Sequence, residues 1–301
     1  MPLYEPTVTL SRGDASIALP PRPAGGTSPT GGIMLIYGST GLGIAPVDVE
    51  TVSVPSGNGS LLRHTRLAER DIYLPVALFG ETVEECDQLR DELMALVDPL
   101  AGPVRITVQS QTREQHARWI DAVYTEGLSG DYSKDFNGVT HKLGLKFRAP
   151  DALWRLDTVT RQWQIAPGVK PFLSKTTPFF PIILTSSSIA GRFRIDVQGQ
   201  EPVWPVWTVT GPGEDLTITS GGKRIRIDGA LKAGEVITID TANGDVYNGE
   251  NLNGELWSRV SLDTELFQLQ PGAQDVQVTL TGASEASMLT LAYEPLYLAG
   301  Y

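Results

Sequence analysis

The chain has 301 residues, which is enough for two domains of ordinary size. Charged residues make up 20% and hydrophobic residues 41% of the sequence, a balance typical of a globular protein and not of a disordered one. The net charge of −11 disfavours binding of nucleic acid from solution, and the single cysteine, Cys86, excludes an intramolecular disulfide and a Cys-rich zinc site.

The beginning of the chain is rich in turn-forming residues. Residues 1–32 include a Pro- and Gly-rich run at 20–26 and predict a loop or an extended arm. The apolar residues at 33–37 predict a short buried strand, and the alternation of apolar and polar residues over 47–54 predicts a half-exposed strand. The glycines and serines at 56–60 predict a mobile loop.

A glycine-rich segment, 38–43, follows the first of these strands. A phosphate-binding loop would need Lys and then Ser or Thr after its last glycine, but Ile44 and Ala45 stand there. A dinucleotide fold would need a helix at this point, and Pro46 falls in its first turn. The segment is therefore predicted to be a hairpin or the tip of a loop.

The clearest local pattern is a helix at about 82–97, after an apolar strand at 72–80. Thr82 and Glu85 fit a capping box, in which each side chain accepts the other residue's backbone amide. Pro99 and Gly102 end the helix. One apolar stripe is expected to pack across a sheet. The stripe consists of Val83, Cys86, Leu89, Leu93, Met94 and Val97.

The remaining elements are strands. Residues 103–110, 117–124 and 139–149 predict three strands, and a domain boundary is placed near residue 150. Beyond it the pattern is purely β, with the short strands and turns of a sandwich. Clean alternation marks 223–228 and 276–280, and Asn243-Gly244 predicts a hairpin between 236–241 and 245–247 with positive φ at both turn residues. The sequence predicts a mainly β fold with one α-helix and two domains, 1–150 and 151–301.

No motif indicates catalysis. The three histidines, His64, His116 and His141, lie far apart in the sequence, and Cys86 falls on the apolar stripe of the helix. No serine occupies a Gly-x-Ser-x-Gly elbow, and the segment 240–245 lacks the alternating acids of a calcium loop. We therefore predict no catalytic, cofactor-binding or metal-binding residue.

Three tryptophans of the second half allow a different interpretation. Trp204, Trp207 and Trp257 could form a platform on which sugars stack, because they lie in a predicted sandwich among acidic neighbours. Large aromatic residues in a sandwich are more often part of its core. The sugar platform is kept as an alternative.

The order of several short motifs resembles the distal tail protein of long non-contractile-tailed bacteriophages, a minor tail or baseplate hub protein. The likeness covers most of residues 65–301. The first half contributes 70–75, 80–82, the helix through Leu96, 99–103, 118–120 and 147–154, although Ala152 stands where family members often carry Pro after Asp. The second half contributes 205–212, 233–235, 239–241 and 266–272.

This resemblance implies a β-sandwich or split barrel with one helix, closing into a homohexameric ring, followed by a galectin-like or jelly-roll-like β-sandwich. The implied partners are the tail tube protein, the tape-measure protein, and tail-tip hub or receptor-binding proteins, with DNA only in transit. The implied location is the tip of the virion tail. Because no secretory signal and no membrane-spanning run is visible, synthesis in the host bacterial cytoplasm is expected.

The main hypothesis is therefore a virion structural protein, not an enzyme, that passes DNA and anchors tip or receptor-binding proteins. We expect the segments 11–32 and 56–60 to become ordered on assembly. The acidity suits the wall of a DNA conduit, and lateral pairing in a ring would protect exposed sheet edges. Two rival hypotheses stay open: a carbohydrate-binding sandwich that recognises a host cell-wall polymer, and an enzyme of polysaccharide breakdown.

Overall fold

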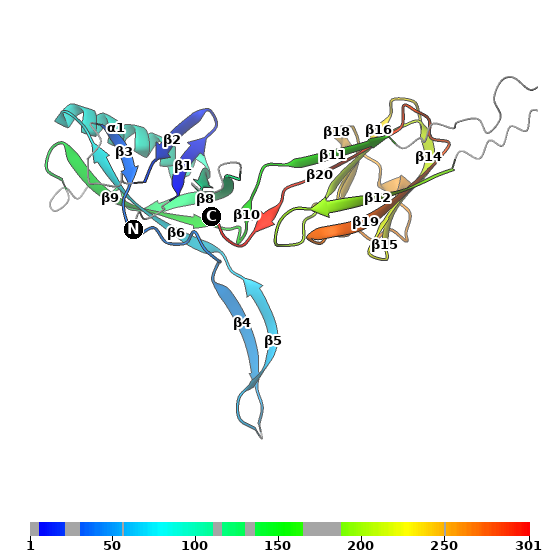
Figure 1. The fold of residues 1–301 in the computed structure, drawn as a ribbon, viewed down its shortest axis with the longest axis horizontal. Coiled ribbons are helices and arrows are strands. Elements are labelled where there is room, and N and C mark those ends of the chain that lie inside the picture. Colours follow the sequence, from blue (N-terminus) through cyan, green and yellow to red (C-terminus); the bar gives the residue numbers. More distant parts are fainter. Residues whose placement is uncertain are drawn as a thin grey trace, which may run out of the picture. The chain divides into compact units, whose positions relative to one another are not determined.

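The structure is a computed structural model that describes residues 6–21, 31–55, 57–110, 116–129, 136–164, 188–249 and 251–301. The chain forms two compact units. The first contains Met1–Leu156 together with Tyr297–Tyr301, and the second contains Asp157–Leu296. Both consist mainly of strands, and the described residues include one α-helix (Figure 1), which confirms the predicted fold class.

The first unit is built on one antiparallel sheet. Its main path runs in the order β2-β1-β7-β8-β9-β6-β3, and β10 pairs with both β8 and β21. The strands are β1 (Thr7–Arg12), β2 (Ala15–Leu19), β3 (Gly32–Leu35), β6 (Arg70–Phe79), β7 (Val104–Gln109), β8 (Arg118–Glu126), β9 (Thr140–Ala149), β10 (Trp154–Arg155) and β21 (Leu296–Tyr297).

This sheet curls until its two edge strands meet. The backbone amide of Leu35 donates to the carbonyl of Pro20 at 2.8 Å, and Pro21 forms a parallel bridge with Leu35. The end of β2 is thereby joined to β3, and the sheet becomes a nearly closed barrel. Its interior is apolar, and residues such as Leu74 and Phe147 have no solvent exposure.

The middle of the predicted leader differs from expectation. β1 and β2 form a hairpin there, with Gly13 at φ 58° in the turn between them, and Val8, Leu10 and Leu19 are fully buried. Turn-forming residues on both sides obscured two short strands whose buried positions alternate. The predicted loop or arm over 1–32 is therefore wrong at these strands, while residues 1–5 and 22–30 lie outside the described part.

The helix α1 (Val83–Val97) contacts β1, β2 and β6. Thr82 is its N-cap, and its hydroxyl accepts the backbone amide of Glu85 at 3.2 Å. The Glu85 carboxylate accepts the amide of Glu81 at 2.7 Å and not that of Thr82. The predicted capping box is therefore formed on one side, and Glu85 acts one residue earlier than expected.

The apolar stripe of α1 faces the barrel over most of its length. Cys86, Leu93 and Val97 are buried, as predicted, and Leu96 joins them. Val83 is the exception: it is 51% exposed and lies beside Gly138 rather than against the barrel. Burial of the Cys86 thiol raises its pKa, an effect to which Asp87 adds and which Arg90 opposes.

A second, separate sheet in the first unit has two strands. β4 (Val47–Ser53) and β5 (Ser60–Leu67) pair antiparallel and form what we term the β4–β5 ribbon (Figure 1). The predicted half-exposed strand at 47–54 is wrong in its burial, since every residue of β4 is exposed. β5 was not predicted, because a register shift between Glu50 and Thr51 interrupts the alternation of the pair.

The second unit is a β-sandwich. A six-stranded sheet has the order β11-β20-β13-β16-β17-β18, and a four-stranded sheet has the order β12-β19-β14-β15. The strands are β11 (Val159–Gln164), β12 (Ser188–Val197), β13 (Val206–Thr210), β14 (Gly213–Ser220), β15 (Lys223–Leu231), β16 (Val236–Asp240), β17 (Asp245–Asn248), β18 (Asn251–Glu255), β19 (Gly272–Thr281) and β20 (Met288–Tyr293).

The core of the sandwich comes from both sheets. Trp207 and Ile239 from the larger sheet and Ile218 and Val278 from the smaller one are fully buried in a single cluster. Their neighbours along each strand point outward, as the alternating burial of β13 and β14 shows. The predicted second-half sandwich is confirmed.

The predicted hairpin between β16 and β17 is present, with a different turn. Asp240 pairs with Asp245 across four intervening residues, and only Gly244 has positive φ, at 78°. The Asp240 carboxylate accepts the backbone amides of Ala242 and Asn243, which stabilises this wider turn. A two-residue turn with positive φ at both positions was therefore the wrong geometry.

Candidate functional site

The described residues do not bring together a cluster of side chains that could bind a metal ion. No group of three or more His, Cys, Asp or Glu side chains among them could hold a metal ion. His64 lies on the exposed ribbon, whereas His141 is buried on β9, where its ring meets that of Phe136 at 5.3 Å between centroids. The glycine-rich segment 38–43 and the turn after Asp240 are explained by the conformation of the backbone, without a bound ligand.

The three tryptophans of the sugar-platform alternative have different surroundings. Trp207 has no solvent exposure and belongs to the sandwich core, so it offers no face to a ligand in this structure. Trp204 is 42% and Trp257 is 45% exposed. Trp204 precedes β13, and Trp257 opens the 3-10 turn Trp257–Arg259. A three-ring platform is therefore not formed.

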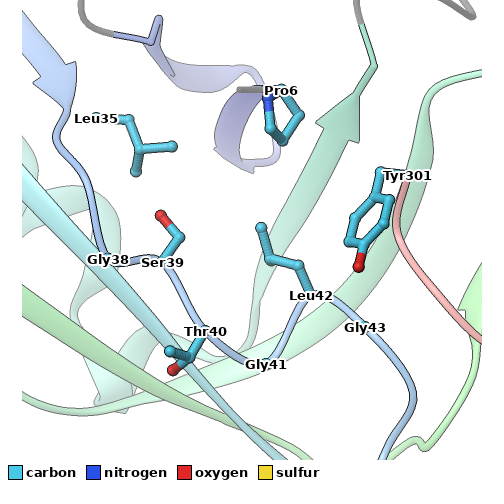
Figure 2. A pocket seen from close by; sticks show the side chains of 9 residues that line it. All are labelled: Pro6, Leu35, Gly38, Ser39, Thr40, Gly41, Leu42, Gly43 and Tyr301. Atoms are coloured by element: carbon cyan, nitrogen blue, oxygen red, sulfur yellow. The ribbon is translucent and has the colours of Figure 1, made fainter. Parts of the chain in front are cut away.

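The glycine-rich segment lines a cavity of about 270 Å³ in the first unit (Figure 2). Thr40 exchanges backbone hydrogen bonds with Tyr73 at 3.0 and 3.1 Å, so the segment is held along β6. A Cβ on Gly41 would stand 2.1 Å from the carbonyl oxygen of Asp71, so only glycine fits this approach. The close packing against a strand explains the glycines without a phosphate ligand.

The chemistry of this cavity is sparse. Leu35, Leu42 and Pro6 supply apolar walls, Tyr301 closes one side, and the Ser39 hydroxyl has no hydrogen-bond partner among the described residues. No charged side chain lines it. Such a cavity has neither an acid–base pair nor a set of ligands with which to run a reaction.

The main polar feature of the first unit is the buried side chain of Arg70, at the start of β6. It is 1% exposed, and it donates to the carbonyl oxygens of Gly41 at 3.0 Å and Gly43 at 2.7 Å. It also donates to the carbonyl oxygens of Ala152 and Leu298, the latter at 3.3 Å. One guanidinium therefore joins three segments that are far apart in the sequence.

The environment of Arg70 is unusual for a charge. Burial lowers its pKa to about 10, an effect that Asp151 partly opposes, so the side chain stays protonated at neutral pH. The guanidinium carbon lies 5.4 Å from the ring centroid of the buried Trp154. Its charge is balanced by carbonyl dipoles and an aromatic face, an arrangement that holds backbone in place and offers no site for a ligand.

A second arginine holds the last residues of the chain. Arg118, 6% exposed, donates to the carbonyl oxygen of Ala299 at 2.7 Å and to the backbone oxygen of Tyr301 at 3.1 Å. Its guanidinium carbon lies 3.7 Å from the ring centroid of Tyr297. Together with Arg70 it ties the segments before and after the second unit into the first unit. Sequence reasoning missed both arginines, because their acceptors are backbone atoms.

Acidic side chains on or next to β6, β8 and β9 form ion pairs with basic ones, so the charge of this region is mixed. Arg148 lies 3.0 Å from Asp71 and 3.5 Å from Glu69, and Lys146 pairs with Glu126. These pairs are largely solvent-exposed, so each contributes little to stability. The acidity of the whole chain is therefore not concentrated on this sheet.

Two families of phage tail proteins match parts of the chain. Residues 36–148 match the family described as a phage tail protein RIFT-related domain, and residues 198–297 match the C-terminal domain of siphovirus-type tail components. The two ranges fall almost wholly within the first and the second unit, respectively. No curated protein sequence matches the chain.

A solved structure shows a similar fold. The chain is similar to the Dit protein of phage SPP1, described as a paradigm of the hub adsorption apparatus in phages that infect Gram-positive bacteria. The TM-score is 0.60 at 13% identity, covering 87% of this chain and 93% of that one. The baseplate of phage p2 in its activated conformation also contains a similar chain, with a TM-score of 0.46 at 12% identity, covering 93% and 99%.

Proposed function

Because this chain belongs to the siphovirus-type phage tail components of the Dit kind, we propose that six copies of it close into a ring between the tail tube and the tail tip. The chain is a structural protein of the phage tail with the role of a distal tail hub. In the proposed assembly the first unit forms the ring, and the second unit docks the proteins that recognise the host.

One observation carries the assignment: the two compact units each match a tail family, in the order that the sequence resemblance implies. The physical features agree with a structural part. A nearly closed barrel provides a rigid body for a ring. Arg70 and Arg118 fix both chain connections to the second unit in that body, so that force on the second unit reaches the ring.

The test of this proposal is the assembly state. Light scattering after size-exclusion chromatography, over a range of protein concentrations, should give a mass six times that of the 32.6 kDa chain. Negative-stain images should show rings with a central hole. A chain that remains monomeric across the whole range, or a closed dimer without a hole, would contradict the proposal.

The proposed partners are the tail tube protein, the tape-measure protein, and tail-tip hub or receptor-binding proteins, with DNA passing through the ring. The net charge of −11 is a property of the whole chain and is not concentrated on the sheet of the first unit, so it does not by itself support passage of DNA without adhesion. Synthesis in the host cytoplasm and assembly at the tail tip complete the proposal. Cross-linking mass spectrometry on purified virions should join this chain to those tail proteins.

The proposal includes the absence of enzymatic activity. This part of the proposal is supported by the matches to structural tail families and by the lack of a metal-binding cluster among the described residues. No helix in that part of the chain is long and apolar enough to cross a membrane. Release of soluble sugar from purified host cell walls by the pure protein would contradict the proposed absence of enzymatic activity.

Carbohydrate binding by the second unit is not favoured by the comparisons, and the burial of Trp207 removes the centre of the suggested platform. A glycan array or a pull-down on host cell walls tests whether the second unit binds sugar through Trp204 or Trp257. Binding that is lost on Trp204→Ala or Trp257→Ala would restore this function beside the hub role.

A further inference from the structure

The helix α1 presents one side to the barrel and the other to solvent. Its main contacts are with β1, β2 and β6 (Figure 1). A stripe of residues at helical spacing on the opposite side is exposed, and it consists of Glu84, Gln88, Asp91 and Ala95. The outer side of the helix is therefore open to a partner.

A groove of about 380 Å³ lies between the second half of this helix and the β1–β2 hairpin, and we term it the α1 groove. Leu96 from the helix and Ile17 from β2 supply its apolar lining. The short side chains of Ala15 and Ala95, both exposed, leave the space above them empty. The groove can therefore receive an apolar side chain from outside.

Two charged side chains line the α1 groove, and they differ in what they already bind. Arg12 donates to the carbonyl oxygen of Asp98 at 2.7 Å and to that of Ala95. It thereby supplies the cation that the end of α1 attracts, because the last turn of the helix contains no basic residue. Glu92, by contrast, has no hydrogen-bond or ion-pair partner among the described residues. The charge left for a ligand at the groove is therefore negative.

The helix next to the groove carries much of the acidity of the chain. Residues 81–98 contain seven Asp or Glu and one basic residue, Arg90, so their net charge is −6 within a chain of −11. Arg90 already pairs with Asp87 at 3.0 Å and lies 4.0 Å from Asp91. All the acids except Asp87 are exposed. This surface repels nucleic acid and anionic lipid and attracts a basic partner.

The groove and the charges together define the chemistry of that partner. No group of His, Cys, Asp or Glu side chains among the described residues could hold a metal ion, so the acids are not a cation site of that kind. Leu100, 96% exposed, follows two residues after Asp98 and adds an apolar side chain beyond the end of the helix. A protein segment that combines apolar side chains with Lys or Arg matches both features.

We propose that the α1 groove docks a basic segment of another tail protein. The segment places an apolar side chain between Ile17 and Ala95, and its Lys or Arg residues lie over Glu92 and Asp91. This inference rests on the proposed hub function for the class of partner, and it specifies where on the first unit that partner binds.

The first test uses the full chain and a fluorescent synthetic peptide of Leu and Lys patterned as an amphipathic helix. Fluorescence anisotropy should show binding with a Kd that rises with salt, because exposed charges are screened. A peptide with Glu in place of Lys, and one with Ser in place of Leu, should each bind at least about tenfold more weakly, since each lacks one of the two features. Equal binding of the three peptides would overturn the proposal.

Two variants of the chain locate the binding. Ala95→Phe fills the α1 groove and should raise the Kd of the Leu–Lys peptide by about tenfold or more. Glu92→Lys reverses the unpaired charge and should raise it by about threefold to tenfold, with a weaker dependence on salt. Glu285→Lys, at an exposed acid of the second unit, is the matched control and should leave the Kd unchanged. Thermal unfolding should match the wild type throughout, because all three positions are exposed.

A photo-crosslinking residue at position 16, which lines the groove and is exposed, tests the partner in purified virions. Peptide mapping should place the cross-links in a Lys- or Arg-rich segment of a different tail protein. Cross-links to another copy of this chain, or peptide binding that Ala95→Phe leaves unchanged, would overturn the docking site and leave the hub function standing. A chain that binds the peptide in the groove but never forms rings would overturn the hub function and support the docking of a basic segment.

Discussion

The two units bury different kinds of polar group. Among the described residues, the first unit buries the charged side chains of Arg70 and Arg118, whereas the buried polar side chains of the second unit are hydroxyls. In the second unit the Thr241 hydroxyl donates to Pro205 O at 2.5 Å and that of Ser287 to Pro212 O at 2.6 Å. Burying a charge is costly unless it is fully hydrogen-bonded, so the first unit carries a constraint that the second does not.

That constraint concerns the path of the chain. The arginine acceptors lie up to 228 positions away in sequence, and they include the segments that leave for the second unit and return from it. Both units have strand ladders and an apolar core, and among the described residues only the first adds buried arginines to them. The two arginines therefore fix the chain segments that flank the second unit within the first unit.

The largest expected effect lies in the apolar core of the second unit. Trp207→Ala should lower the free energy of unfolding of that unit by about 3–5 kcal/mol, because it leaves a large cavity. Hydrogen exchange of amides in β13 and β16 measures the change. Trp204→Ala, at a half-exposed neighbour, is the matched control and should cost below about 1 kcal/mol. Equal effects would show that Trp207 is not a core residue.

Arg70→Met should destabilise the first unit by about 3 kcal/mol, because several buried carbonyl groups lose their donor at once. Denaturant unfolding followed by hydrogen exchange in β6 and β9 gives the value, and the second unit should be unaffected. Arg70→Lys keeps the charge but not the planar fork, so it should restore only part of the loss. Full stability in Arg70→Met would refute the anchoring role.

Arg118→Met should have a smaller and more local effect of about 1–2 kcal/mol, because it removes the hydrogen bonds to Ala299 and Tyr301 and the ring contact with Tyr297. Amide exchange of residues 298–301 should speed up strongly, while that of β9 changes little. Arg105→Met, on the neighbouring strand with its exposed partner Asp121, is the control and should leave these amides protected.

The smallest effect concerns an ion pair of the second unit. The backbone amide of Lys232 and the guanidinium of Arg259, at 2.9 Å, hold the pKa of Glu235 below its usual range. A carboxyl group whose pKa is lowered on folding stabilises the folded state at pH values above its unfolded pKa. This stabilisation is lost as the pH falls through the pKa of the folded state. Glu235→Gln should cost about 1 kcal/mol at pH 7, and the difference should shrink below about pH 4. A difference that does not change with pH would exclude this cause.

Local chemistry in the sequence predicted a substantial part of the fold. The helix followed from the Thr82 cap and its apolar stripe, and the strands of the sandwich followed from alternation at positions such as 223–228 and 276–280. The turn at Gly244 was located correctly, but its shape was not, because the Asp240 side chain stabilises a longer loop.

Predictions from the sequence failed where the structure depends on strand pairing with residues elsewhere in the chain. The β1–β2 hairpin was hidden by turn formers around it, and the bulge in the β4–β5 ribbon broke the alternation that marks a strand. Trp207 and Trp204 are close in sequence and similar in context, yet one is buried and the other half-exposed. Trp207 lies within β13 and is buried in the core, whereas Trp204 lies before that strand, and only the tertiary structure shows where the strand begins.

By itself, the sequence determined the β-rich class, the helix and the order of motifs that identifies a tail component, because these depend on neighbouring residues. Only the tertiary structure decided that the first sheet closes on itself, that a long ribbon stays outside it, and that Arg70 and Arg118 hold the end of the chain. Those features depend on backbone carbonyls and sheet edges, which every residue carries and which no sequence pattern distinguishes.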